Sequence, residues 1–295
     1  DSSVTGVQTC TLPICSGPLT IANDVATFKI GTTTTFGIVT VSGGAITRIT
    51  PADYVVSVDS STDVAWDIAA WSPSVPSGDL SGKSLIAAIP SGSTLSLPSS
   101  LSGASLTVVG SGVLTNGTSD VTTLDGVTLA GAINAAGTVK TSGTTTLNGS
   151  NKFAGALEVV SGTTTLYTAD QGVTGDLTVD ADATLVAKTT DSIWYDVSNT
   201  STVSVYGTLD LDTARWSIRA PLSFKVYAGG SVTGQGDSTW STSIDVISGN
   251  TFTLECLANG ENTAATISAP IRVDADFQFS VAQGVTANCS SMIIQ

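Results

Sequence analysis

Two pairs of closely spaced aspartates are the residues best able to do chemistry in this chain. Asp180 and Asp182 form one pair, and Asp274 and Asp276 form the other. The members of an Asp-x-Asp pair on a strand point to one side, where they could bind Ca²⁺, a hard cation that prefers oxygen ligands. Two opposed carboxylates can also cleave a glycosidic bond. Aspartates are more often turn residues, and we favour that interpretation for these four.

The chain contains no histidine. Histidine is the most common general base and zinc ligand, and it activates serine and cysteine nucleophiles. Most hydrolase mechanisms are therefore excluded, whereas carboxylate, tyrosine or lysine chemistry stays open. We expect no catalytic residues, no enzyme activity, and no cofactor unless the aspartates bind calcium.

Large aromatic residues recur at a regular spacing. Trp194, Trp216 and Trp240 are separated by 22 and 24 residues, and Tyr206 and Tyr227 by 21. Residues repeated once per turn of a repetitive fold stack in a column. A buried column would belong to the core, which is the interpretation we favour. An exposed column would be a platform for sugar rings, or a contact between subunits.

Threonine tracts occur at residues 32–35, 144–146 and 163–165. A regular array of threonines on a flat solenoid would resemble the surface of ice-binding proteins. Thr145 and Thr164, at the centres of the last two tracts, are then the residues to substitute. The alternative is that threonine is simply a favoured strand residue.

Four cysteines lie near the two ends of the chain, and an even number favours two disulfides in an oxidising compartment. Proximity in sequence predicts the pairs Cys10 with Cys15 and Cys256 with Cys289, although other pairings or four buried free thiols remain open.

N-glycosylation sequons support secretion weakly, because a chain rich in Ser and Thr acquires some of them by chance. The acceptor residues are Asn116, Asn148, Asn199 and Asn288.

Short repeated segments are the main sequence evidence for the fold. Ser142-Gly-Thr-Thr-Thr-Leu147 recurs nineteen residues later as Ser161-Gly-Thr-Thr-Thr-Leu166. Apolar residues also alternate with polar ones in triplets at a similar period, so each triplet sends two side chains into a core. Stacked units of this kind predict an all-β fold, a right-handed parallel β-helix with coils of about 20 residues. The triplets begin at Leu106, Val127, Leu157, Leu177, Val203, Phe224 and Ile244.

The segment before these repeats predicts the entry to the solenoid. Residues 81–89 can form a short amphipathic helix, and the Pro90-Ser-Gly turn leads into a strand of alternating Thr, Ser and Leu. This order resembles pectate-lyase-like right-handed β-helices, and more generally adhesin-type β-solenoids. The resemblance implies a helix that caps the open end of the core, and it concerns architecture, not activity.

Strand-like segments also precede the solenoid, which predicts a small N-terminal β module and linker over residues 1–76 and a β-helix body over residues 77–295. Residues 2–14 resemble the conceptual translation of a sequencing adapter, so the first cysteine pair carries little weight.

The composition of the chain argues against some classes of binding partner. The chain has 24 acidic and 10 basic residues and a formal net charge of −14. Nucleic acids and anionic membranes are attracted by positive surfaces, which this composition does not supply. We expect no nucleic-acid partner and, since no apolar run is long enough to span a bilayer, no membrane insertion. We expect a processed protein that is secreted and is either extracellular or at the cell surface.

These features predict an extracellular structural or adhesive protein, a self-assembling subunit of a surface fibre or filament. The exposed strand edges at the ends of a solenoid are templates for head-to-tail association. The alternative is a β-helix that binds or cleaves carbohydrate through the aromatic column and the carboxylates. Ice binding is the third hypothesis.

Overall fold

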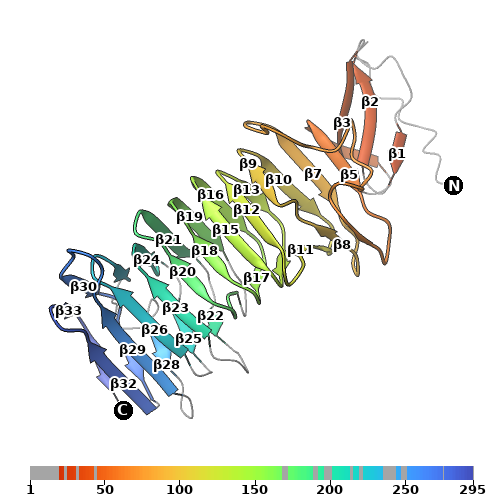
Figure 1. Ribbon diagram of the computed structural model, residues 1–295. Helices are drawn as coiled ribbons and strands as arrows, with labels where there is room; N and C mark the ends of the chain where they lie inside the picture. The colour runs from red at the N-terminus through yellow and green to blue at the C-terminus, as the bar shows by residue number, and fades with distance from the viewer. Residues whose placement is uncertain are drawn as a thin grey trace. The chain divides into compact units, whose positions relative to one another are not determined.

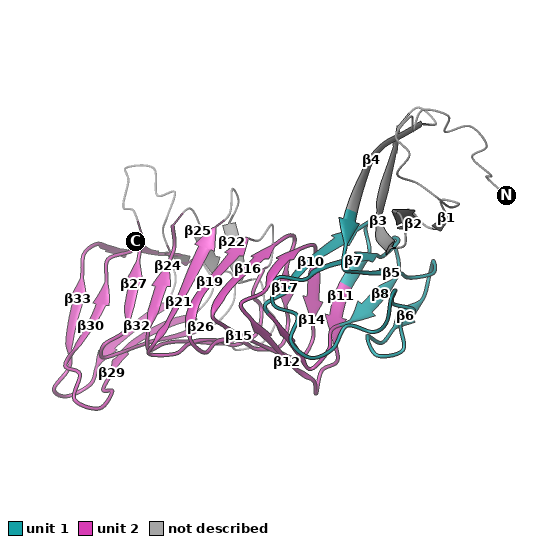
Figure 2. Ribbon diagram, turned by 90° about the horizontal axis from the view of Figure 1, so that it is seen from above, with its two compact units in different colours: residues 1–96, 103–113 teal, residues 97–102, 114–295 magenta. Residues whose placement is uncertain are grey.

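The computed structural model consists of β-strands, turns and loops. It describes residues 20–22, 25–30, 33–42, 45–167, 172–188, 192–195, 201–212, 215–218, 222–234, 244–246, 251–274 and 276–294, and no helix is found in these ranges. The expected all-β solenoid is confirmed, with about 8 turns. Two compact units divide the chain, one of residues 1–96 and 103–113 and one of residues 97–102 and 114–295 (Figure 2).

An antiparallel sheet of four strands opens the first unit (Figure 1). Its strands pair in the order of the sequence, as expected for successive hairpins, and form the predicted small β module. They are β1 (Thr20–Ala22), β2 (Val25–Ile30), β3 (Thr33–Ser42) and β4 (Ala45–Ala52).

Parallel pairing begins directly after this sheet, within the same unit. β5 (Tyr54–Ser57) pairs with β7 (Ser84–Ala88), and β7 pairs with β10 (Ser105–Val109). β6 (Asp63–Val64) pairs with β8 (Thr94–Ser96). Parallel strands joined by loops that pass around a core are the defining arrangement of a β-solenoid.

The second unit repeats one coil of three strands, and each strand belongs to a different wall. The first wall contains β9 (Ser100–Ser102), β12 (Val121–Asp125), β15 (Thr138–Ser142), β18 (Leu157–Val159), β20 (Leu177–Val179), β23 (Ser201–Val205), β26 (Leu222–Tyr227), β29 (Thr251–Leu257) and β32 (Asp276–Val281). The second wall contains β13 (Thr128–Ala130), β16 (Thr144–Asn148), β19 (Gly162–Tyr167), β21 (Ala183–Lys188), β24 (Thr208–Asp210), β27 (Ser231–Thr233), β30 (Ala264–Ile267) and β33 (Thr286–Cys289).

The third wall consists of two separate sheets. One contains β14 (Ile133–Ala135) and β17 (Lys152–Phe153), with β11 (Val113–Asn116) beside β14. The other contains β22 (Ser192–Tyr195), β25 (Arg215–Ile218), β28 (Ile244–Val246), β31 (Ile271–Val273) and β34 (Met292–Ile294).

Side chains alternate between the core and the outside along each strand, and the register keeps them in columns. Leu129, Leu147 and Leu166 are register partners in successive coils of the second wall, and all three are fully buried. The residues that precede these leucines, Thr128, Thr146 and Thr165, are polar and face outward. This alternation is what the apolar triplets of the sequence predict.

The turn between the first and second walls explains the repeated Ser-Gly dipeptide. Gly143 and Gly162 have φ values of +61° and +69°, in the left-handed region that favours glycine. Each glycine directly precedes a strand of the second wall or begins it, so the sequence repeat marks a repeated corner.

The capping helix predicted over residues 81–89 is wrong, because this segment contains strand β7. Leu85, Ile86, Ala87 and Ala88 are all buried, so both faces of the strand are covered. A strand that is covered on both faces has a continuous run of apolar residues in its sequence, and a short helix can have the same kind of run. Ile86 packs against Val55 on the neighbouring strand.

The outer edge of β5 is covered by a loop instead. Val55 and Ser72 exchange two backbone hydrogen bonds of 2.9 and 2.8 Å. Trp66 and Trp71 are buried in this loop, with ring centroids 4.5 Å apart. Their indole nitrogens donate hydrogen bonds to the carbonyls of Pro76 and Trp66, so the loop is held in place.

The inward columns predict a contrast between neighbouring residues of one strand. Leu147→Ala should destabilise the protein by about 2–5 kcal/mol, because it leaves a cavity in a fully buried column. Thr146→Ala, one residue away and facing outward, should change stability by about 0.5 kcal/mol or less. Urea denaturation followed by circular dichroism measures both, and equal shifts would contradict the observed orientation.

Candidate functional site

The tryptophans proposed as a column do not share one register. In the third wall, Trp216 is the register partner of Ile193 and Ile244, whereas Trp194 is the partner of Ser217. Trp194 and Trp216 are therefore offset by one residue and do not occupy equivalent register positions in adjacent coils. Trp240 lies outside the described residues.

The tyrosines do stack. Tyr206 and Tyr227 follow β23 and end β26, and their ring centroids are 3.8 Å apart with an interplanar angle of 15°. The hydrogen bond with Tyr227 and burial raise the pKa of Tyr206 to about 12. Each ring covers one face of the other, so this pair leaves fewer free faces for a sugar ring than two separate platforms would.

Asp180 and Asp182 lie in the turn between β20 and β21, not on one strand face. The amide of Ala183 donates to the Asp180 carbonyl at 3.0 Å, which closes the turn. Burial, and then the Glu158 carboxylate, raise the pKa of Asp180. The turn interpretation of this pair agrees with the structure.

Asp274 directly follows β31, Asp276 is the first residue of β32, and both are exposed. Within the described ranges, no group of three or more His, Cys, Asp or Glu side chains could hold a metal ion.

The threonine tracts of residues 144–146 and 163–165 divide between the core and the outside; residues 32–35 lie where no side chains are described. Thr145 and Thr164 are fully buried. The Thr145 hydroxyl donates to the Ser142 carbonyl at 2.8 Å, and the Thr164 hydroxyl donates to Thr141 Oγ1 at 2.7 Å. The two residues that we expected to lead an exposed array therefore satisfy hydrogen bonds inside the solenoid.

The outward threonines form a longer column than the sequence suggested. Six hydroxyl residues, which we call the hydroxyl column, are register partners in successive coils of the second wall, and none of them is buried. Only two of them, Thr144 and Thr163, were visible as repeats in the sequence, because the other four stand in coils of different sequence. The column consists of Thr144, Thr163, Thr184, Thr208, Ser231 and Thr266.

The four sequon asparagines differ in access. Asn116 is buried, its amide nitrogen donates to the Thr138 carbonyl at 3.1 Å, and its oxygen accepts from the Gly137 amide at 3.0 Å. The side-chain nitrogen of Asn116, which would carry a glycan, is therefore buried and hydrogen-bonded in the folded chain. Asn148 and Asn288 are exposed, and Asn199 lies outside the described residues.

Cys256 and Cys289 are both free thiols, so the disulfide predicted between them is not formed in this structure. They lie on different walls of adjacent coils, Cys256 on β29 and Cys289 on β33. Burial and the neighbouring Cys289 thiol raise the pKa of Cys256 to about 11. Cys10 and Cys15 lie outside the described residues.

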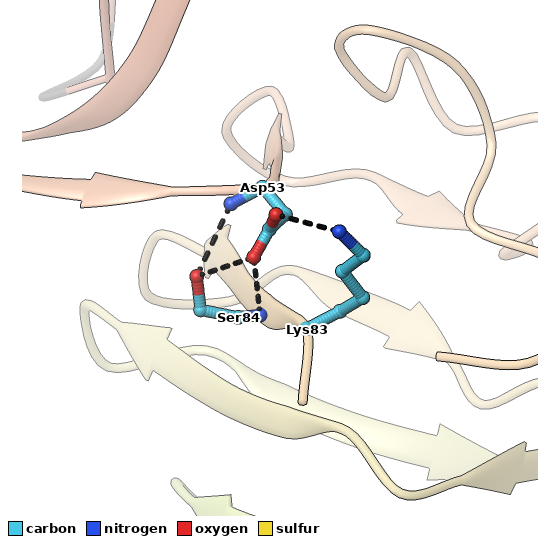
Figure 3. A network of polar contacts seen from close by, with 3 residues as sticks. All are labelled: Asp53, Lys83 and Ser84. Carbon is cyan, nitrogen blue, oxygen red and sulfur yellow. Dashed lines mark hydrogen bonds and ion pairs between the residues drawn. The ribbon is translucent and has the colours of Figure 1, made fainter. Parts of the chain in front are cut away.

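A polar cluster ties the first two parallel strands of the first unit together (Figure 3). The Asp53 carboxylate accepts hydrogen bonds from the Ser84 amide at 2.8 Å and from the Ser84 hydroxyl at 3.1 Å, and it pairs with Lys83 Nζ at 3.2 Å. The Asp53 amide donates to the Ser84 carbonyl at 2.8 Å. The backbone hydrogen bond from Ser84, together with Lys83, lowers the pKa of Asp53. Sequence reasoning missed this cluster, because its residues are 30 and 31 positions apart.

The last coil of the second unit is open on all three walls. Among the described strands, β32, β33 and β34 each end their sheet, so each has one edge without a neighbouring strand. Phe279 and Val281 are the register partners of Leu254 and Cys256, which are fully buried one coil earlier. In the last coil the exposed fractions of Phe279 and Val281 rise to 44% and 41%.

The same change occurs on the third wall, where Val273 is fully buried and its register partner Ile294 is 60% exposed. Aromatic packing continues up to this boundary, since Phe252 stacks on Phe277 with centroids 5.9 Å apart. The last coil therefore exposes apolar side chains at positions that belong to the core one coil earlier, and one edge of each of its strands has no partner among the described strands.

Comparison with protein families, curated proteins and solved structures finds no significant match to this chain. No helix in the described part of the chain has the length and apolar character needed to cross a membrane.

The Asp53 cluster predicts a pH-dependent contribution to stability. Since the folded-state pKa lies below the ordinary 3.8, the contribution is present above that value and is lost as the pH falls through the lowered pKa. Asp53→Asn should destabilise the protein at pH 7 by about 1 kcal/mol or less, because the carboxylate is partly exposed. The difference from the unmodified chain should shrink as the pH falls below 3.8 and through the lowered pKa of Asp53.

Thermal unfolding between pH 2 and pH 7 measures this effect. Asp67→Asn, the same charge change at an exposed residue, is the matched control. A difference at pH 7 that persists unchanged at pH 2 would show that the carboxylate charge is not responsible.

Proposed function

We propose that this chain is an extracellular structural and adhesive protein whose subunits assemble through the last coil. The observation that supports the proposal is that, among the described strands, β32, β33 and β34 each leave one edge free and that β32 and β34 carry apolar side chains that are partly exposed. Parallel strands with free edges pair readily with further strands, and the apolar side chains inside them gain burial when that happens.

The energetics favour an assembly that depends on concentration. Completing the burial of Phe279, Val281 and Ile294 contributes on the order of 1 kcal/mol for each side chain. The loss of translational and rotational freedom on association costs about 4–15 kcal/mol. Backbone pairing around the whole coil must supply the remainder, so we expect association at micromolar concentrations or above.

The net charge acts in the opposite direction. Two copies with a formal charge of −14 each repel one another, which keeps the free chain soluble. Salt screens this repulsion, and the Debye length falls to about 8 Å at physiological ionic strength. Association should therefore strengthen from low to physiological salt, as expected for a protein that assembles outside the cell.

Substitution at the last coil tests the proposal. Phe279→Asp should abolish self-association without unfolding the monomer, because it places a charge at a partly exposed position that assembly would bury. Ile68→Asp is the matched control, since Ile68 is an apolar residue that is 76% exposed on the first unit. Sedimentation velocity and negative-stain microscopy of the unmodified chain at increasing concentration measure the association. A chain that stays monomeric at high concentration and physiological salt would refute the proposal.

The hydroxyl column supports a second candidate function, ice binding. Its hydroxyls repeat once per coil, at the strand spacing of about 4.8 Å, in six successive coils. A second outward column runs beside it through Thr128, Thr146 and Thr165, and then continues with Val186 and Asp210. The doubled array is thus restricted to the coils of β16 and β19.

Ice binding predicts thermal hysteresis that depends on the outward threonines. Thr163→Tyr should remove most of it, because Thr163 is inside the doubled array, whereas Thr178→Tyr on the outer face of the first wall should leave it unchanged. Nanolitre osmometry measures the hysteresis. Its absence from the unmodified protein would dismiss this candidate.

A further inference from the structure

We propose that Tyr206 and Tyr227 form a site of oxidative modification, at which their two rings couple into a dityrosine cross-link between adjacent coils. The oxidant is hydrogen peroxide with a haem peroxidase, which removes one electron at a time from phenols. The cross-link would lie within one chain, so it does not depend on whether the chain assembles.

The two tyrosines occupy matching positions on neighbouring strands of the first wall. Val205 on β23 and Val226 on β26 are register partners, and one tyrosine directly follows each valine. Both valines are fully buried. Because side chains alternate along a strand, the tyrosines face outward, and both are partly exposed. The fold therefore holds two phenols together at a surface that dissolved reagents can reach.

The rings are arranged for coupling to one another. Their centroids are 3.8 Å apart, the interplanar angle is 15°, and the hydroxyl groups are joined by a hydrogen bond. Dityrosine forms through a bond between the ring carbons ortho to the two hydroxyl groups. In two nearly parallel rings whose hydroxyl groups lie at the same end, these carbons also lie side by side, so the reacting atoms start close together.

The neighbouring residues of the same outer column limit the reaction to this pair. Leu257 is the register partner of Tyr227 in the following coil. In the preceding coil the corresponding residue is Asp180, which follows Val179, the register partner of Val205. Neither leucine nor aspartate forms a phenoxyl radical. Each tyrosine thus has one phenol beside it in the column, and we expect a single intramolecular product.

The reaction balances with one molecule of peroxide for each cross-link. Each phenol loses its hydroxyl proton and one electron and becomes a phenoxyl radical. The two radicals form one C–C bond between their ortho carbons. Each of these carbons then loses its proton and each oxygen regains one, which restores both aromatic rings. Peroxide takes up the two electrons and two protons released in the first step and becomes two molecules of water.

A cross-link at this position would reinforce the strand pairing of two coils with a covalent bond. Tyr206 and Tyr227 are 21 residues apart, so the bond closes a loop that contains one complete coil. Closing a loop restricts the unfolded chain more than the folded one, as a disulfide does. We therefore expect the urea concentration at the midpoint of unfolding to rise after oxidation.

Oxidation of the purified full chain at low concentration tests the proposal. Trypsin cleaves after Lys and Arg, which places Tyr206 in the peptide of residues 189–215 and Tyr227 in the peptide of residues 226–272. After treatment with hydrogen peroxide and a haem peroxidase, we expect mass spectrometry to find these two peptides joined, lighter than their sum by two hydrogen atoms. The product should show dityrosine fluorescence and migrate as a monomer in denaturing electrophoresis.

Phenylalanine variants provide the controls, because they remove a hydroxyl group and keep the ring. Tyr206→Phe and Tyr227→Phe should each reduce the joined peptide and the fluorescence to about a tenth or less, since one of the two reactants held together is gone. Tyr167→Phe, which removes a phenol that is 37% exposed on the second wall, should leave both signals unchanged.

Three results would overturn the proposal. The first is an oxidised chain that contains no joined peptide. The second is a yield of dityrosine in Tyr206→Phe as high as in the unmodified chain, which would place the reactive phenols elsewhere. The third is a cross-link found only between chains, as a covalent dimer in denaturing electrophoresis. A rise in the urea midpoint that also occurs in oxidised Tyr206→Phe would show that the cross-link does not stabilise the coils.

Discussion

Each coil of the solenoid is covered only by the coils next to it, and the rest of the structure depends on this constraint. An inward side chain such as Leu254 is fully buried because Phe224 and Phe279 lie in register on either side of it. The backbone groups of each strand are satisfied in the same way. The stability of the solenoid is therefore approximately a sum of contributions from each coil and from its contacts with the neighbouring coils. A terminal coil lacks one of these neighbours, which leaves the problem of covering its apolar side chains and backbone groups.

The structure treats that problem differently in its two units. In the first unit, a loop containing two buried tryptophans occupies the edge of β5 and takes up its backbone hydrogen bonds. In the second unit, β32 keeps its edge and its apolar side chains exposed. The edge strand β5 of the first unit is thus covered by its own chain, whereas the outer edge of β32 has no partner among the described residues of the second unit.

The sequence predicted the solenoid because its apolar triplets and Ser-Gly corners repeat at the coil period, and coil stacking converts that period into columns. Prediction from the sequence failed where the position of a side chain depended on the register between strands or on which faces of a strand are covered. Residues 84–88 are apolar on both faces, so a buried strand and a helix looked alike. A spacing of 22 residues places Trp194 and Trp216 one position out of register, and the parity that buries Thr145 while exposing Thr144 depends on where the strand begins. The exposure of Phe279, Val281 and Ile294 was not predicted, because the exposure of an inward side chain depends on which strands pair with its coil.

The matching corners at Ser142-Gly143 and Ser161-Gly162 also have a consequence for how such a chain changes over generations. The nineteen residues between these corners form a complete coil, with the same entry and exit geometry at both boundaries. Insertion or deletion of one such nineteen-residue unit between the two matching six-residue motifs would add or remove one whole coil and would preserve the columns on either side. The number of coils can therefore change by one while the strand pairing of the flanking coils stays the same.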